Sequence, residues 1–153
     1  MINIEGQIDK NIAFAILIFM AFIILLFATV IILYSYNNKK KNKMIEIKKS
    51  ELKKNYNNEK IFFCDYVIKD GNAFQLNGEA FNTSITPGMK IEINGIEHEI
   101  KEVYGFDDTP EDPDPAIPQT NPYGLVLIES NQINYQKLKE RLKKELVIPF
   151  ILR

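Results

Sequence analysis

Residues 12–34 read IAFAILIFMAFIILLFATVIILY, an apolar stretch without a charge, a proline or a glycine. A helix rises about 1.5 Å per residue, so this stretch reaches roughly 35 Å, whereas the hydrocarbon core of a bilayer is about 30 Å thick. A small globular domain has no need of so long an apolar segment. The stretch therefore predicts a single N-terminal transmembrane helix, followed by enough chain for one small domain.

The charges on either side of this stretch predict its orientation. Residues 1–11 carry Glu5 and Asp9 against Lys10 alone, which is unlike the basic start of a secretory signal peptide. The apolar stretch is also too long for such a peptide, so we expect an uncleaved anchor. Lysines follow the stretch, and a basic excess beside a span stays on the cytoplasmic side. We therefore expect a single-pass protein of the cell membrane, with residues 1–11 outside and the domain in the cytoplasm.

Charge is segregated along the chain, although the net charge is only −1. Residues 39–60 hold nine basic and three acidic side chains, residues 61–130 hold three and thirteen, and residues 131–153 hold six and two. A basic neck, an acidic body and a basic tail are therefore three different surfaces. The lone Cys64 excludes an internal disulfide.

Residues 35–60 are rich in Lys and Asn and predict a solvated juxtamembrane neck, with a brief helix from about residue 44 to residue 54. A topology signal and spacer is the favoured interpretation of these lysines, and a dedicated lipid-binding patch is the alternative. The two are compatible, because a lysine near an anionic leaflet contributes about 1 kcal/mol to membrane attraction. The candidate contacts for lipid or another polyanion are Lys39, Lys40, Lys41, Lys43, Lys48 and Lys49.

Residues 61–153 predict a domain that is built mainly of strands. Residues 61–68 are aromatic and β-branched, which is typical of a strand. A turn at residues 69–72 separates them from a second predicted strand at residues 73–81.

The next segment predicts a β-hairpin. Asn94 and Gly95 lie between residues 90–93 and 96–104, and both central residues of a type I′ turn need a positive φ. Residues 124–128, GLVLI, then form a continuous apolar run that suits a strand buried on both sides. Several short strands with regular turns predict a small, mainly antiparallel β-barrel.

Part of this barrel region resembles a known family. Residues 65–93, DYVIKDGNAFQLNGEAFNTSITPGMKIEI, are similar to the second, β-barrel domain of translational GTPases of the elongation factor Tu type, and residues 123–127 are similar to a later strand of it. The matching positions are Asp65, Gly71, Gly78, Ile85, Gly88, Ile91 and Ile93. Ala73 and Thr83 depart from the family, which has Gly at both. The resemblance implies the barrel fold and suggests ribosome or RNA association, but the P-loop pattern of a GTPase domain is absent from the sequence.

The loop of residues 105–122 is far longer than a hairpin needs, and such loops are usually functional or disordered. Five prolines are interleaved with its acidic residues, and the spacing of an EF-hand is missing, so an extended solvated segment is favoured over a calcium site. The candidate residues for docking a protein partner are Asp107, Asp108, Glu111, Asp112 and Asp114.

Two other residues that often carry chemistry have simpler interpretations here. His98 is in phase with Ile100 on the predicted inward face of its strand, which favours a packed, hydrogen-bonded histidine. Cys64 alternates with Phe62 and Tyr66 on one strand face and has no basic neighbour in sequence, which favours a small buried hydrophobe. We therefore predict no catalytic, cofactor-binding or metal-binding residues.

Residues 134–146 predict an amphipathic helix, because leucines recur at every fourth position from Leu138. Asn131 or Asn134 can cap its start. Residues 147–152 return to strand character and are expected to close the barrel, with Pro149 placing them at an edge. The alternative is that this helix and the apolar end lie on the membrane surface.

Two classes of function remain. The first is a membrane-anchored, non-enzymatic interaction module with a cytoplasmic protein partner. The second is a membrane-tethered factor that associates with RNA or the ribosome, although the acidic body argues against nucleic acid binding by the barrel itself. Ala21 and Ala28, one heptad apart, offer a weak face for pairing two spans, so a homo-oligomer is the alternative to simple anchoring.

Overall fold

The computed structural model describes the backbone of residues 4–105 and 116–153, with side chains from residue 12 onward within those ranges. The chain divides into two compact units, Met1–Lys43 and Met44–Arg153. Each unit is described by itself below.

The first unit is helical and contributes most of α1 (Ile4–Asn55). Within the described residues, α1 is the one helix that is long and apolar enough to cross a membrane. Its large apolar side chains are exposed all round, as expected for a helix whose solvent is not water. The helix also continues through residues where we expected a solvated neck with only a brief helical part. Lysine is a good helix former and no proline or glycine interrupts residues 7–70, so nothing in this segment ends the helix early.

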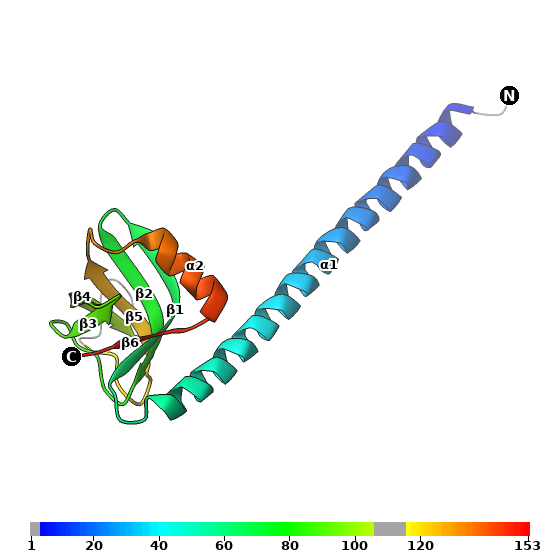
Figure 1. The fold of residues 1–153 in the computed structure, drawn as a ribbon. Helices are drawn as coiled ribbons and strands as arrows, with labels where there is room; N and C mark the ends of the chain where they lie inside the picture. The colour runs from blue at the N-terminus through cyan, green and yellow to red at the C-terminus, as the bar shows by residue number, and fades with distance from the viewer. Residues whose placement is uncertain (1–3, 106–115) are drawn as a thin grey trace. The chain divides into compact units, whose positions relative to one another are not determined.

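The second unit is a six-stranded antiparallel barrel within the described residues, as predicted. Its elements are β1 (Ile61–Asp70), β2 (Ala73–Phe81), β3 (Lys90–Ile93), β4 (Ile96–Gly105), β5 (Tyr123–Glu129), α2 (Tyr135–Glu145) and β6 (Ile148–Ile151) (Figure 1). The strand order is β3-β4-β5-β2-β1-β6. Lys90 and Arg153 exchange two backbone hydrogen bonds of 2.9 Å, and Ile91 bridges to Leu152, so the two edges meet and the barrel is nearly closed.

Two glycines show the geometry that the strand pairs require. The hairpin of β3 and β4 turns through Asn94 and Gly95, whose φ values are 55° and 80°, as the predicted type I′ turn demands. Gly78 of β2 has a different reason. A Cβ there would lie 2.1 Å from the carbonyl oxygen of Phe63, so only glycine lets β1 and β2 pair this closely.

A β-bulge changes the predicted alternation of β1. The register with β2 shifts between Cys64 and Tyr66, so Asp65 is the extra residue. Phe62 and Cys64 point into the core as expected, but Tyr66 is 55% exposed and Val67 is buried in its place. The prediction that Tyr66 shares their face is therefore wrong.

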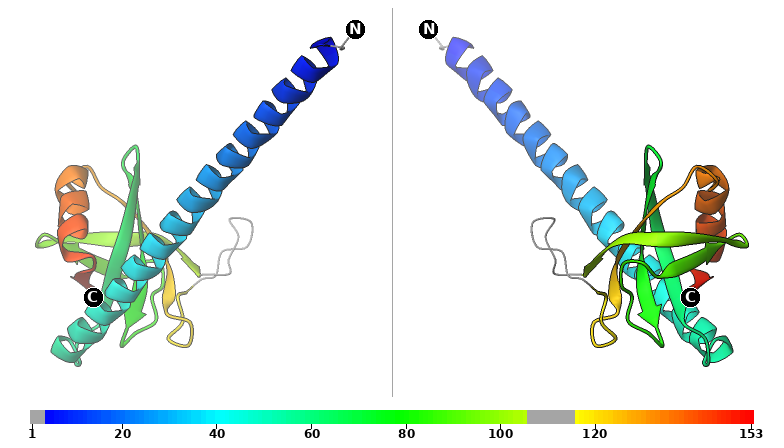
Figure 2. Two further views of the ribbon diagram at one scale, coloured as in Figure 1. Left: turned by 90° about the vertical axis from the view of Figure 1, so that its right-hand side faces the viewer. Right: turned by 90° about the vertical axis from the view of Figure 1, so that its left-hand side faces the viewer.

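The C-terminal segment completes the barrel. α2 lies along one side of the strands (Figure 2) and buries Leu138 and Leu142 in the main core. The predicted packing of this helix on the barrel is therefore confirmed, and its apolar face is not free to lie on a membrane. The Asn134 side chain accepts a hydrogen bond of 3.0 Å from the Lys137 N–H, which is the expected cap. β6 pairs with β1, with Pro149 opposite Phe63.

Candidate functional site

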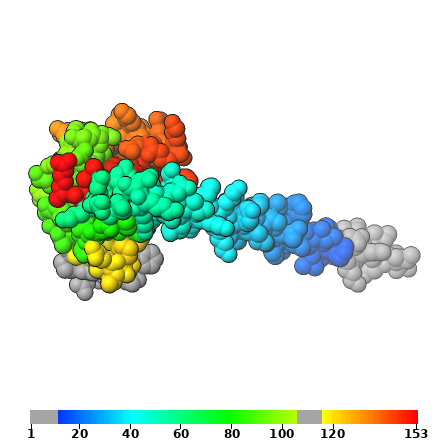
Figure 3. Space-filling view, turned by 60° about the horizontal axis from the view of Figure 1, so that its bottom comes forward, coloured from blue at the N-terminus to red at the C-terminus, as the bar shows by residue number. Residues whose placement is uncertain are grey.

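The end of α1 belongs to the barrel domain and docks on the outer face of the barrel. Ile45, Leu52 and Tyr56 lie on one helical face and pack against a second, smaller core of Ile61, Phe63 and Val147. The space-filling view shows the last turns of α1 lying on the domain surface beside the C-terminal segment (Figure 3). Residues 44–56 are thus part of the folded domain.

Lys49 occupies the middle of this docking face, and it is only 2% exposed. Its Nζ lies 2.9 Å from Asp65 Oδ2 and 3.5 Å from Glu79 Oε2. It also lies 5.0 Å from the centre of the Tyr123 ring, which favours a cation over its face. A buried ammonium is tolerated only when it is paired in this way, so Lys49 fixes the helix to three strands.

The β-bulge explains how Asp65 reaches the lysine. As the extra residue of the bulge, Asp65 leaves the alternation of β1, so its side chain can take part in contacts outside the core. Its Oδ2 faces Lys49, and its Oδ1 accepts a hydrogen bond of 2.9 Å from the Tyr123 hydroxyl. Burial, together with the charge of Asp65, raises the pKa of Tyr123, so that the phenol stays protonated and continues to donate.

Lys53, one turn further along α1, balances the second carboxylate. Its ammonium pairs with Glu79 Oε1 and lies 5.5 Å from the centre of the Phe81 ring. The two lysines therefore balance the two largely buried carboxylates, and a third carboxylate, the exposed Glu46, lies 4.0 Å from Lys49 Nζ at the rim. We call Lys49, Lys53, Asp65, Glu79 and Tyr123 the docking network.

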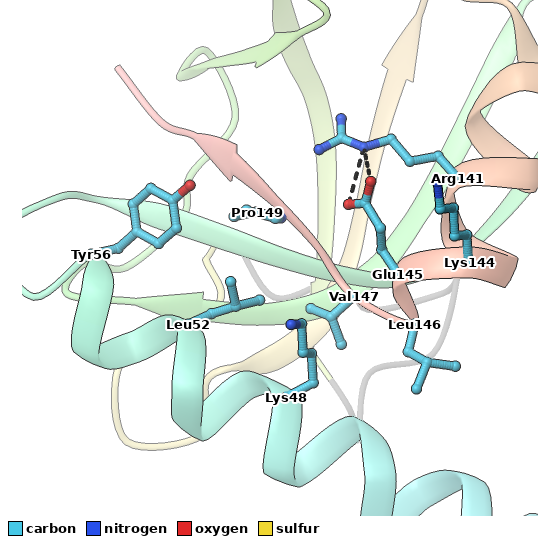
Figure 4. Close-up of a pocket in the computed structure, with 9 residues that line it drawn as sticks. All are labelled: Lys48, Leu52, Tyr56, Arg141, Lys144, Glu145, Leu146, Val147 and Pro149. Carbon is cyan, nitrogen blue, oxygen red and sulfur yellow. Dashed lines mark hydrogen bonds and ion pairs between the residues drawn. The ribbon is translucent and has the colours of Figure 1, made fainter.

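Beside the docking network lies an open groove between the end of α1, α2 and β6, with a volume of about 550 Å³. Leu52, Leu146, Val147, Pro149 and the Tyr56 ring form its apolar part (Figure 4). The charged side chains that line it are Lys48, Arg141, Lys144 and Glu145. We call these nine residues the basic groove.

The charges in the basic groove are only partly compensated. Arg141 uses Nε to contact both carboxylate oxygens of Glu145, at 3.0 and 3.1 Å, as the dashed lines in Figure 4 show. Lys48 lies 3.7 Å from Glu51, and its side chain is 42% exposed. Lys144 is exposed and has no ion-pair partner in the described part of the chain. Three cations thus line the groove with one carboxylate.

The predicted polyanion contacts fall into three environments. Lys39, Lys40, Lys41 and Lys43 are exposed in the first unit, and Lys48 lines the basic groove. Lys49 is buried in the docking network, so its ammonium is not available to a lipid, and this assignment was wrong. The predicted docking residues Asp107, Asp108, Glu111, Asp112 and Asp114 lie outside the described residues.

Cys64 and His98 are both buried, as expected. Cys64 donates its S–H to the Tyr66 carbonyl at 3.3 Å, and burial raises its pKa, so it is an unreactive thiol. His98 is packed as expected, but its Nε2 has no hydrogen-bond partner within the described part of the chain, contrary to our expectation, and desolvation lowers its pKa. Among residues 4–105 and 116–153, no group of three His, Cys, Asp or Glu side chains is placed to hold a metal ion.

Sequence reasoning missed the docking network because it treated the lysines of residues 39–60 as one solvated group. A signal was present, since Ile45, Lys49, Leu52 and Tyr56 follow the spacing i, i+4, i+7 and i+11 of one helical face. Lys49 holds a position where a buried apolar residue is normally found.

Comparison with known proteins found no relative of this chain: no protein-family model, no curated protein and no solved structure matches it.

Proposed function

We propose that this protein is a membrane-anchored, non-enzymatic interaction module whose barrel is held at the cytoplasmic face of the cell membrane. The observation that carries the proposal is the start of the domain at Met44, only nine residues after the apolar stretch that ends at Tyr34. Even a fully extended chain spans at most about 3.6 Å per residue, so these nine residues, which are helical here, cannot reach further than roughly 32 Å. The barrel is thereby confined to a thin layer beside the bilayer.

Confinement supports a binding role, because it raises the effective concentration of the module for any target in the same layer. We propose a cytoplasmic protein as that target, with the acidic residues 107–114 as the contact. The docking network supports this role indirectly, because it seats the barrel on the end of the helix that carries the anchor.

Two labelled positions test anchoring and orientation together. Asn3→Cys should react with an impermeant maleimide in intact cells, whereas Lys101→Cys, on the exposed face of β4, should react only after lysis. Native Cys64 is fully buried and serves as the silent background. The chain should also resist extraction with alkaline carbonate. Release by carbonate, or labelling at position 101 in intact cells, would contradict the proposal.

A second candidate function is association with RNA or the ribosome, as the resemblance to the translational GTPase barrel suggests. Specific support comes from α2, which holds five basic and two acidic side chains. The barrel strands oppose it, because the described residues of 61–130 carry eight acidic and three basic side chains. RNA held by several phosphate contacts would give a logarithmic salt dependence with a slope of several units. Binding of the detergent-purified chain to ribosomal RNA that persists at physiological salt would favour this candidate.

A further inference from the structure

We propose that the basic groove binds the phosphate-bearing headgroups of anionic phospholipids and thereby turns the α2 side of the barrel toward the bilayer. This inference rests on the proposed function, because the anchor supplies the membrane. It adds a site on the folded domain, distinct from the lysines that directly follow the apolar stretch.

The first argument is the unused positive charge in the groove. Glu145 is occupied by Arg141 Nε, and the two terminal nitrogens of Arg141 have no partner among the described residues. Lys144 is exposed on the last turn of α2, and Lys48, whose contact with Glu51 at 3.7 Å is loose, lines the same groove from the end of α1 (Figure 4). A phosphate between these side chains would receive charge-assisted hydrogen bonds from two helices.

The second argument is the chemistry beside the charges. Leu52, Leu146 and Val147 line the same groove as the cations. A phospholipid offers a matching pair of groups, a phosphate and the apolar glycerol and acyl region next to it. The groove is open rather than enclosed, which suits a headgroup that remains part of a bilayer.

The third argument is that charge selects which face of the tethered domain meets an anionic leaflet. The barrel strands are acidic and would be repelled, whereas the exposed residues of α2 include Lys137, Lys143 and Lys144. Leu138 and Leu142 are used inside the barrel, so α2 has no apolar face to insert. The contact is therefore electrostatic and should weaken as salt rises.

The test uses the full chain in lipid nanodiscs of phosphatidylcholine alone or with one third phosphatidylserine. The rate of amine acetylation at each lysine is measured by mass spectrometry. Lys144 should react at least threefold more slowly in the anionic discs, and the protection should disappear at about 1 M salt, where the screening length falls to about 3 Å. Lys101, an exposed lysine of β4, is the internal control and should react at the same rate in both discs.

Variants identify the groove as the origin of the protection. Lys144→Gln with Arg141→Gln should remove the protection of Lys48 in anionic discs, whereas Lys101→Gln should leave it unchanged. Lys144→Gln alone should reduce it, and this exposed position carries no risk to the fold. Unchanged protection of Lys48 in both groove variants would overturn the proposal.

The remaining outcomes separate the sources of phosphate and the two proposals. Equal rates at Lys144 in both discs, or equal slowing at Lys101, would overturn the headgroup site while leaving the anchor intact. Protection by inorganic phosphate or by RNA in neutral discs, without an effect of anionic lipid, would assign the groove to another anion. Failure of the chain to insert into either disc would instead contradict the proposed function.

Discussion

The two ends of α1 use the same secondary structure in opposite ways. Between Ile12 and Tyr36 nearly all the large apolar side chains are exposed, on every side of the helix. After Met44, by contrast, Ile45, Leu52 and Tyr56 share one face and pack on the barrel, while Ile47 stays 52% exposed on another face. Leu33 is 61% exposed, while Leu52 contacts the second core. The comparison teaches that the surroundings of a helix determine how apolar side chains are distributed around it. A bilayer favours apolar side chains on all sides, whereas packing on a protein surface needs an apolar stripe on one side only.

Removing the Lys49 ammonium should have the largest effect on residues 44–55 of α1, which pack on the barrel and which we call the docked end. Lys49→Ala leaves the largely buried Asp65 without its cation and Glu79 with Lys53 alone, and breaking a buried pair in this way typically costs about 3–5 kcal/mol. We expect a loss of this size in the free energy of unfolding. Urea denaturation of the full chain in detergent micelles, followed by the near-ultraviolet circular dichroism of its tyrosines, measures it.

Lys54→Ala is the matched control for that substitution. Lys54 lies in the last turn of α1 but is exposed, so its removal should change the free energy of unfolding by less than about 0.5 kcal/mol. Equal effects of the two substitutions would mean that Lys49 is as solvated as its neighbours. That result would contradict the claim that this end of α1 is packed on the barrel.

The strands were predictable because their signals are local. Turn residues that need a positive φ, such as Asn94 and Gly95, and the alternation of apolar side chains determine where each strand starts and ends. The predicted bounds of β2 and β3 agree with the structure, and α2 differs by one residue at each end. The closing strand was predictable for a different reason, since a barrel without it would leave an open edge.

The helical half of the docking network carried a signal in the spacing of its residues, but the half on the barrel was not predictable because it depends on a local irregularity. The bulge at Asp65 shifts the register of β1, and no signal in the residues around Cys64 reveals that shift. Without it, Asp65 has no reason to meet Lys49. The basic groove was equally hidden, because Lys48 and Arg141 are far apart in sequence and their meeting requires the tertiary packing of Leu52 and Val147.

Alkaline pH should have the next largest effect, on the barrel core through Cys64 and on the docking network through Tyr123. Burial raises the pKa of Cys64 and of Tyr123 in the folded state, so both contribute stability that is present at neutral pH and is lost as pH rises above the pKa of the unfolded chain. For the fully buried thiol, each pH unit above about 8.5 should remove about 1.4 kcal/mol. Urea midpoints measured from pH 7 to pH 10.5 test this.

Two variants assign the alkaline loss. Cys64→Ala should flatten the fall that begins near pH 8.5, and Tyr123→Phe should flatten the part above about pH 10 while keeping the ring beside Lys49. A slope that both variants leave unchanged would show that neither buried group is protonated preferentially in the folded state.

The apolar contact of the docked end should have a moderate effect. Leu52→Ala removes a half-buried side chain from the second core, so we expect a loss of about 1–2 kcal/mol, below the range for a fully buried leucine. Leu33→Ala is the matched change at the other end of the helix and should leave the urea midpoint of the domain unchanged. A similar midpoint for both variants would mean that the end of α1 does not pack on the barrel.

Within the docking network, the smallest effect should come from loss of Lys53. Comparing it with Lys49 separates the effect of burial from that of charge pairing. Its side chain is 34% exposed and water can reach the ammonium, whereas the Lys49 side chain is 3% exposed, yet both lysines pair with Glu79. Loss of Lys53 leaves Glu79 paired with Lys49, so Lys53→Ala should reduce the free energy of unfolding by about 1 kcal/mol or less. In the Lys49→Ala background the same change should cost more, because Glu79 would then lose its last cation. Additive effects in this double-mutant cycle would show that the two lysines do not share a carboxylate.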